Sequence, residues 1–168
     1  MYFYVGNKSI QKGVSNYPSG TPIKSQLDLV RWISRNYLQQ PDSSPYITAT
    51  FVIDRSGYLR LAPRHSEHVA CAGNQPVLSA GEITLMKVAD RYEVTEISNQ
   101  STGYCPEPES YYYVQQALNK IPITSPDRFT SEFIFRLCNY CEQINIVKDN
   151  WFLCGVCNRE LPTGWNFD

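Results

Sequence analysis

Four cysteines form two Cys-x-x-Cys pairs, Cys138 with Cys141 and Cys154 with Cys157, and the twelve residues EQINIVKDNWFL separate the pairs. Two such pairs joined by a β-prone segment with a central turn are typical of a zinc ribbon, in which four thiolates hold one tetrahedral ion. A four-cysteine shell leaves no open position for water or substrate, so this ion is expected to be structural. Paired disulfides and a rubredoxin-like iron site share the spacing and stay open as alternatives.

A second possibility for metal chemistry lies in STGYCPEPES, residues 101–110, which contains Cys105-Pro106-Glu107. Zinc-dependent nucleobase deaminases combine a metal ligand, a glutamate acid/base and a further Cys-x-x-Cys pair. Here the residues after Cys141 read INIV, which is β-prone where a deaminase needs a helix, and that pair already has a partner pair. We therefore expect Cys71 and Cys105 to be free thiols, and Pro108 with its acidic neighbours to mark a helix entry. A deaminase remains the lesser alternative.

A third group of polar residues could support catalysis without a metal. The only two histidines lie in RHSEHVACAGNQPVLSAGEITL, residues 64–85, and the loop NQSTGY, residues 99–104, follows a strand-like run. If the two segments meet, a histidine can act as base and a hydroxyl as nucleophile or orienting group. The candidate catalytic residues are His65, His68, Glu82, Ser101 and Tyr104. The alternative is that the histidines bind nearby backbone and that Ser-Thr-Gly is ordinary turn chemistry.

Charge and hydropathy restrict the partners. Fifteen basic and sixteen acidic residues leave a formal charge of -1, so no strong field attracts phosphate backbones, and nucleic acid is not an expected partner. The first residues, MYFYVGNKSIQKG, do not read as a signal peptide, and no apolar run approaches the roughly 20 residues of a membrane span. We expect a cytoplasmic protein without a membrane partner. Aromatic residues such as Trp151 and Trp165 favour a protein partner, and the oligomeric state is left open.

The elements that position these residues follow from periodicity. MYFYV, residues 1–5, is typical of a strand, the following residues read as a loop, and Ser25 is a candidate N-cap for a helix that ends before Pro41. Leu29, Val30, Ile33, Tyr37 and Leu38 form its predicted apolar side. Residues 46–53 with 58–63, and 81–88 with 91–98, predict two antiparallel hairpins.

A second helix is predicted over ESYYYVQQALNKI, residues 109–121, with Tyr112 or Tyr113, Ala117 and Ile121 at helical spacing. Residues 129–137 predict a strand that leads into the cysteines. The predicted fold is α+β: a mainly antiparallel sheet of about five strands, two helices on one face, and a C-terminal zinc ribbon. The predicted domains are 1–130 and 131–168.

Residues 65–120 resemble an uncharacterised bacterial module. The resemblance rests on His65-Ser66, on PVLSAGEI and on ISNQSTGYCPEPES, which match a His-Ser, Ala-Gly-Glu and Ser-Gly-His-Tyr-x-Pro pattern. The chain departs from the pattern at residues 102–105, where Thr-Gly-Tyr-Cys replaces the expected Gly-His-Tyr order. The histidine of the pattern therefore has no counterpart in this chain, and any catalytic role of it does not carry over. The resemblance implies a bacterial cytosolic protein, and some carriers look like parts of toxin or conflict systems.

Two classes of function follow. The first is a zinc-binding protein-interaction module with a role in a toxin or defence-type system. The second is an enzyme, a hydrolase or group transferase acting on a nucleotide or a protein side chain through the polar residues between 65 and 104. The sequence favours the interaction module, because no complete set of nucleophile, base and orienting group is defined by spacing.

Overall fold

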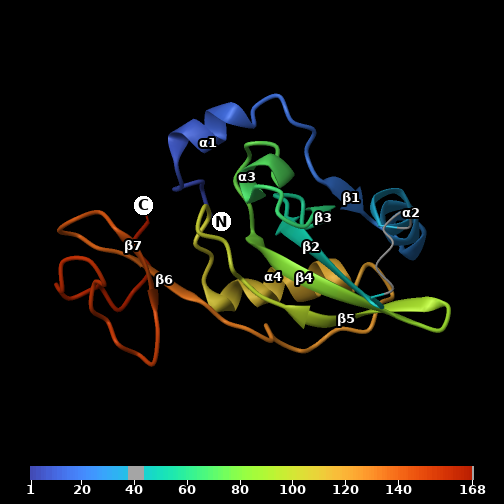
Figure 1. Ribbon diagram of the computed structural model, residues 1–168. Coiled ribbons are helices and arrows are strands. Elements are labelled where there is room, and N and C mark those ends of the chain that lie inside the picture. The colour runs from blue at the N-terminus through green and yellow to red at the C-terminus, as the bar shows by residue number, and fades with distance from the viewer. Residues whose placement is uncertain (38–43, 168) are drawn as a thin grey trace.

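Five antiparallel strands form the central sheet, in the order β1-β3-β2-β4-β5 (Figure 1). The computed structural model describes residues 1–37 and 44–167. β2 (Tyr46–Ile53) pairs with β3 (Leu59–Pro63) and with β4 (Ser79–Val88), and β4 pairs with β5 (Arg91–Ile97). The short β1 (Thr21–Ile23) extends the sheet beyond β3. The predicted antiparallel sheet and both predicted hairpins are confirmed.

The turn between β2 and β3 shows why the first hairpin forms at this place. The Asp54 carboxylate accepts hydrogen bonds from the backbone N–H groups of Ser56 and Tyr58, at 2.9 and 3.1 Å. Gly57 has φ +72°, a left-handed conformation that glycine adopts without the cost a side chain would add. Side-chain and backbone preferences therefore specify the same turn.

Two helices cover one face of this sheet, as predicted. α2 (Gln26–Asn36) begins at Ser25, whose hydroxyl accepts a hydrogen bond from the N–H of Asp28 at 3.2 Å. The apolar side of α2 differs from the prediction, because Trp32 is buried with Leu29 and Ile33 while Val30 is exposed. Leu38 and Pro41 lie outside the described residues.

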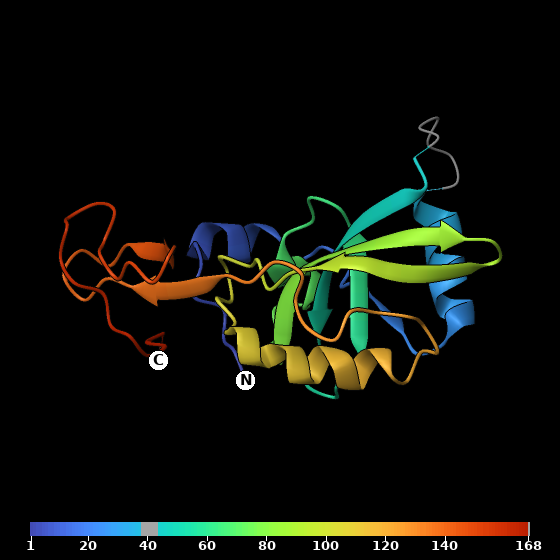
Figure 2. The ribbon, with the colours of Figure 1, turned by 90° about the horizontal axis from the view of Figure 1, so that it is seen from below.

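The second of these helices, α4 (Tyr111–Leu118), follows a short 3-10 turn, η1 (Pro108–Ser110), so proline stands at the helix entry as predicted. Figure 2 shows α4 lying along the sheet. Its buried residues are Tyr111, Val114, Ala117 and Leu118. Tyr112 and Tyr113 are exposed, because the buried stripe runs through Tyr111 instead. The shared core contains residues from both helices and from β2, β3, β4 and β5: Leu29, Trp32, Ile33, Phe51, Ile53, Leu61, Ile83, Leu85, Val94, Val114 and Leu118 among others.

The opposite face is covered by α3 (His68–Cys71), by the N-terminal segment and by Tyr104. Residues 1–5 are not a strand of the sheet: Tyr2 forms an isolated bridge with Val77. The fifth strand is β1, which lies in the segment predicted as loop. The same segment contains α1 (Lys8–Gly13), which begins at Asn7, whose side chain accepts the N–H of Ser9 at 2.8 Å. A local cap, rather than apolar periodicity, therefore specifies α1.

A separate two-stranded sheet of β6 (Ile134–Leu137) and β7 (Ile144–Val147) carries the cysteines and projects from one end of the molecule (Figures 1 and 2). The predicted strand over 129–137 therefore begins later than expected. Before β6, Ser131 forms only a bridge to Ser98, and the N–H of Thr130 donates to the carbonyl of Ile97 at 2.8 Å. Among the described residues, no helix has the length and apolarity needed to cross a membrane.

Candidate metal centre

The Sγ atoms of Cys138, Cys141, Cys154 and Cys157 all lie within 4.8 Å of one another. The sulfurs of Cys138 and Cys157 are 3.5 Å apart, and those of Cys141 and Cys154 are 3.6 Å apart. A tetrahedral ion with Zn–S bonds of about 2.3 Å requires sulfurs separated by about 3.8 Å, so the four thiols fit one zinc-sized ion with little movement. The predicted convergence of the four cysteines is therefore confirmed, and they can hold a metal ion.

Backbone N–H groups around the sulfurs favour the thiolate form that a metal requires. The N–H of Val156 and the side-chain amide of Asn145 donate to Cys154 Sγ, at 3.5 and 3.6 Å. Hydrogen bonds from the backbone of Cys157 and Val156 lower the pKa of the Cys154 thiol to about 6. A backbone hydrogen bond of Gln143 acts in the same direction on the Cys141 thiol, but burial and the neighbouring cysteine sulfurs outweigh it and raise the pKa of that thiol to about 12. Donors of this kind also orient metal-bound sulfurs, so the knuckles are prepared for an ion.

The hydrophobic core of the ribbon is small and contains two of the metal ligands. The cluster around the knuckles has the buried residues Cys138, Val147, Cys154 and Leu161, while Phe135 and Phe167 are buried in a separate cluster with Cys105. A cluster of this size stabilises a hairpin only marginally, because isolated two-stranded sheets bury little surface. The ion is therefore expected to supply much of the local folding free energy, and its closed four-sulfur shell suits this structural role.

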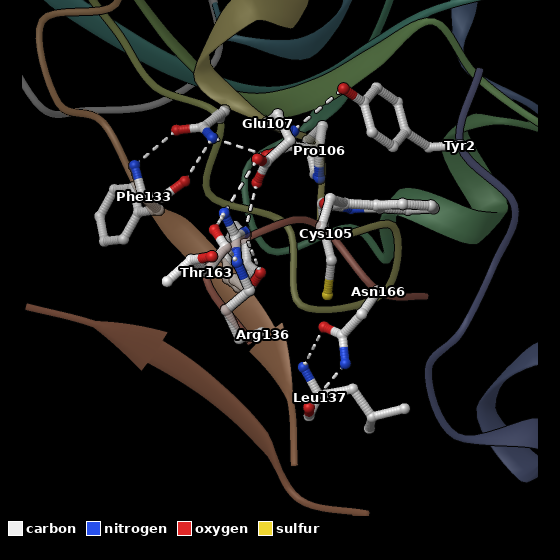
Figure 3. Close-up of polar contacts among 12 residues, drawn as sticks. Tyr2, Cys105, Pro106, Glu107, Phe133, Arg136, Leu137, Thr163 and Asn166 are labelled. Atoms are coloured by element: carbon white, nitrogen blue, oxygen red, sulfur yellow. Dashed lines mark hydrogen bonds and ion pairs between the residues drawn. The ribbon is translucent and has the colours of Figure 1, made fainter. Parts of the chain in front are cut away.

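A buried ion pair joins the ribbon to the sheet domain. The guanidinium of Arg136, on β6, binds both carboxylate oxygens of Glu107, at 2.7 and 3.2 Å (Figure 3). The same guanidinium donates to the carbonyls of Thr163 and Phe135, at 2.8 and 2.6 Å, and Arg136 is only 4% exposed. Glu107 therefore serves as the counter-ion of a buried arginine, in addition to its predicted place at the helix entry.

Residues 99–107, which we call the junction loop, make two further connections to the ribbon. The side-chain amide of Asn99 donates to the carbonyl of Phe133 at 2.7 Å, and its oxygen accepts the N–H of Phe133 at 2.8 Å. The indole N–H of Trp165 donates to the carbonyl of Cys105 at 2.8 Å. Trp165 is therefore packed against the domain rather than exposed as its sequence context suggested. The predicted boundary between 1–130 and 131–168 stays a prediction, and these contacts cross it.

Cys105 lies in the apolar part of this interface and not among the clustered metal ligands. It is buried with Phe135 and Phe167, and its thiol donates to the carbonyl of Thr102 at 3.4 Å. Burial raises the pKa of the Cys105 thiol to about 12, so it stays protonated at neutral pH. The deaminase alternative needs Cys105 at the ion and Glu107 free for proton transfer. Cys105 is not part of the four-cysteine cluster, and the Glu107 carboxylate is bound by Arg136.

Two of the five candidate catalytic residues, His68 and Glu82, lie near each other. His68 Nε2 is 3.0 Å from the carbonyl oxygen of Gly81. Burial lowers the pKa of His68, while the neighbouring carboxylate of Glu82 acts in the opposite direction. Glu82 lines a small groove of about 150 Å³ together with Thr84 and Glu96.

The other three candidates occupy different places. Tyr104 is buried and donates its hydroxyl to the carbonyl of Gln75 at 2.8 Å. Ser101 is buried, and its Oγ has no hydrogen-bond partner among the described residues. His65 is exposed, with φ 70°, and lines two larger clefts that do not include Glu82. The five side chains share no cavity within the described part of the chain, so their joint catalytic role stays a prediction without geometric support.

Sequence reasoning missed the residues that hold the ribbon on the domain. From the sequence, Arg136 looks like an ordinary exposed charged residue of a β-strand, and Asn99 looks like an ordinary turn residue. Their partners lie 29 and 34 residues away in sequence, so no local spacing connects them. One signal in the sequence could have indicated a role for Arg136: it lies between the apolar Phe135 and Leu137 in a predicted strand that leads directly to the first cysteine pair.

Comparisons with protein-family models, with curated proteins and with solved structures find no match.

Proposed function

We propose that this protein is a zinc-binding interaction module, in which a four-cysteine ribbon is held rigidly on an α+β domain and presents a surface to a protein partner. Zinc is proposed as the ion because four-cysteine ribbons are common structural zinc sites; an iron centre would use the same four ligands, and elemental analysis distinguishes the two. Metal binding in this role stabilises a surface rather than a reaction. The proposal concerns the ribbon and not the polar residues between 65 and 104.

The observation that carries the proposal is the exposure of large apolar side chains on the metal-bound element. Tyr140, in the first knuckle, is 66% exposed, Trp151 is 69% exposed, and Val156, in the second knuckle, is 68% exposed. Arg159 lies 5.0 Å from the centre of the Tyr140 ring. Tryptophan, tyrosine and arginine contribute most to binding energy at protein interfaces, and exposed apolar side chains gain free energy when a partner covers them.

The internal contacts of the ribbon support the same function. Trp165 and Phe167 pack together and Trp165 packs against Tyr2, so one side of the ribbon region is used for attachment to the domain. Arg136 is neutralised by Glu107, which leaves few free cations for a phosphate backbone. A protein partner therefore fits the chemistry of the ribbon better than a nucleic acid does. The resemblance of residues 65–120 to a bacterial module supports a place in a toxin or defence system.

Co-purification with matched variants tests the proposal. The metal-loaded protein and its Trp151→Ser, Val156→Ser and Tyr17→Ser variants are used as baits in bacterial lysate, with chemical cross-linking and mass spectrometry. Tyr17 is 66% exposed but lies in the sheet domain, so Tyr17→Ser removes a similar aromatic surface elsewhere. We expect a partner that cross-links to the ribbon and is lost with Trp151→Ser or Val156→Ser but retained with Tyr17→Ser. Capture that is equal for all baits contradicts the proposal.

A further inference from the structure

A cleft of about 690 Å³ lies at one end of the sheet domain. It is lined by the C-terminal end of α2, by the first residues of β2, by the end of β3 with the two residues that follow, and by one residue each of β4 and β5. Small-molecule sites in proteins are clefts of about 300 to 1,000 Å³ with apolar walls and a few polar groups. None of the four metal ligands lines this cleft, so it is separate from the metal centre.

Three tyrosines give the cleft aromatic walls that a ligand can reach. Tyr37 and Tyr92 are half-buried against the core of the sheet domain, and Tyr46 is 53% exposed. The Tyr37 hydroxyl donates to the carbonyl of Thr48 at 2.9 Å and accepts the N–H of Arg64 at 3.3 Å, so these two bonds fix the Tyr37 ring in the wall. Partly exposed aromatic rings favour a ligand with an aromatic or apolar body.

Arg64 brings a positive charge to this wall. Burial raises the pKa of the Tyr37 hydroxyl, whereas the backbone N–H and the positive charge of Arg64 act in the opposite direction. A charge changes a pKa in this way only from nearby, so the guanidinium lies near the Tyr37 hydroxyl. Arg64 is exposed and forms no ion pair with the residues that the structure describes. Its guanidinium can therefore bind an anionic group of a ligand.

Lys87 adds a second cation from the sheet. Successive side chains of a strand point to opposite faces, so Lys87 lies on the same face of β4 as the buried Leu85, two residues before it. The register places Lys87 opposite Tyr92 of β5, which packs against the same core. Lys87 is exposed and, like Arg64, has no ion pair within the described part of the chain.

The lining of the cleft is positively charged although the whole chain has a formal charge of -1. Arg64, Lys87 and His65 line it, and no aspartate or glutamate does so among the described residues. The C-terminal end of α2 carries a partial negative charge of about half a unit, which two full positive charges exceed. Asn36 also satisfies one carbonyl of this helix end, because its amide donates to the carbonyl of Trp32 at 2.7 Å. The cleft therefore suits an anion.

We infer that this cleft binds a small organic anion, in which a phosphate or carboxylate group is attached to an aromatic or apolar body. The anionic group binds Arg64 and Lys87, and the body lies against Tyr46 and Tyr92. The inference goes beyond the interaction function of the ribbon and is independent of it, because no residue of the ribbon lines the cleft.

Isothermal titration calorimetry of the metal-loaded full chain tests the ligand chemistry. Phenyl phosphate and benzoate carry an anion on an aromatic ring, benzyl alcohol keeps the ring without the charge, and inorganic phosphate keeps the charge without the ring. We expect phenyl phosphate or benzoate to bind about tenfold more tightly than either control, and the tighter of the two identifies the anionic group. The inference is overturned if neither binds at millimolar concentration, or if benzyl alcohol or inorganic phosphate binds equally tightly.

Matched variants test the location of the site. Arg64→Gln should weaken binding of the tighter probe about tenfold and keeps the backbone N–H that Tyr37 accepts, whereas Arg55→Gln, at an exposed arginine of the β2–β3 turn, should leave binding unchanged. Lys87→Gln should also weaken binding, while Lys8→Gln, at an exposed lysine of α1, should not. If Arg55→Gln weakens binding as much as Arg64→Gln, the probe responds to general surface charge and the inference is overturned. If Arg64→Gln and Lys87→Gln both leave binding unchanged, the assignment of the cleft is wrong.

Discussion

Substituting Glu107 by glutamine tests how the ribbon is held on the domain. The change keeps the size of the side chain and one acceptor oxygen, but it removes the negative charge opposite Arg136. The Arg136 side chain is 5% exposed and the Glu107 side chain is 21% exposed, so the guanidinium remains buried without a counter-ion. Removing one partner of a buried ion pair costs about 3 to 5 kcal/mol. Because Glu107 is partly accessible to water, we expect about 3 kcal/mol.

Urea unfolding of the metal-loaded protein measures this loss. In a background carrying Trp32→Phe and Trp151→Phe, the fluorescence of Trp165 reports the interface, and hydrogen exchange of β4 amides reports the sheet. With a slope of about 2 kcal/mol per M urea, the expected loss moves the midpoint down by about 1.5 M. Because the ion pair spans the two parts of the molecule, the Trp165 transition should move more than the exchange of the β4 amides does.

Two further variants separate the ion pair from general damage. Glu109→Gln makes the same chemical change two residues away, at an exposed side chain, and should alter the free energy of unfolding by less than about 0.5 kcal/mol. Adding Arg136→Met to Glu107→Gln removes the unpaired charge, so the double variant should lose less than the sum of the single variants. If Glu107→Gln unfolds at the wild-type midpoint, the pair does not hold the ribbon and the reasoning is refuted.

Three other predictions concern the metal, a histidine and a glycine. Cys157→Ser should abolish stoichiometric zinc in elemental analysis and increase hydrogen exchange in β6 and β7 more than in β2, whereas Cys105→Ala should retain one zinc per chain; loss of zinc with Cys105→Ala would revive the deaminase alternative. Because burial lowers the pKa of His68 below its ordinary value of 6.5, protonation favours the unfolded chain. This part of the stability is present above about pH 6.5 and is lost as pH falls, so at about pH 5.5 wild type should lose about 1 kcal/mol more than His68→Gln in denaturant unfolding; equal losses would contradict it. A Cβ at Gly81 would lie 1.9 Å from the carbonyl oxygen of Ser98, so Gly81→Ala should cost more than about 3 kcal/mol or prevent folding, whereas Gly13→Ala, with no atom within 4 Å, should be neutral or stabilising in a thermal melt.

The sequence predicted those parts of the fold that local patterns specify. β2 and β3 were recognisable because period-two alternation meets a turn that contains Asp54 and Gly57, and α2 because Ser25 precedes a helical period. The four candidate metal ligands were recognisable because their Cys-x-x-Cys spacing is typical of two zinc knuckles. In each of these cases, the information lies within about twenty residues of sequence.

The remaining features depend on contacts between distant segments. Residues 1–5 have strand-like composition, but they pair only through Tyr2 with Val77, so composition alone could not place them outside the sheet. The role of Gly81 depends on the approach of the Ser98 carbonyl, and the role of Arg136 depends on Glu107. The five candidate catalytic residues were grouped by an assumed meeting of two loops. Tyr104 is buried and its hydroxyl donates a hydrogen bond to the carbonyl of Gln75, a contact that the periodicity of the sequence does not predict.

The junction loop also has a consequence for the order of events during synthesis on the ribosome. Asn99 and Glu107 emerge before Phe133 and Arg136, so for a time the Glu107 carboxylate has no arginine partner and the Asn99 amide can bind Pro106 but not Phe133. The sheet can pair in this interval, but the loop that closes β5 onto α4 reaches its final hydrogen bonding only when the cysteine-bearing segment has folded over it. Because the proposed ion would stabilise that segment, its supply to the nascent chain would set when the last part of the sheet domain becomes ordered.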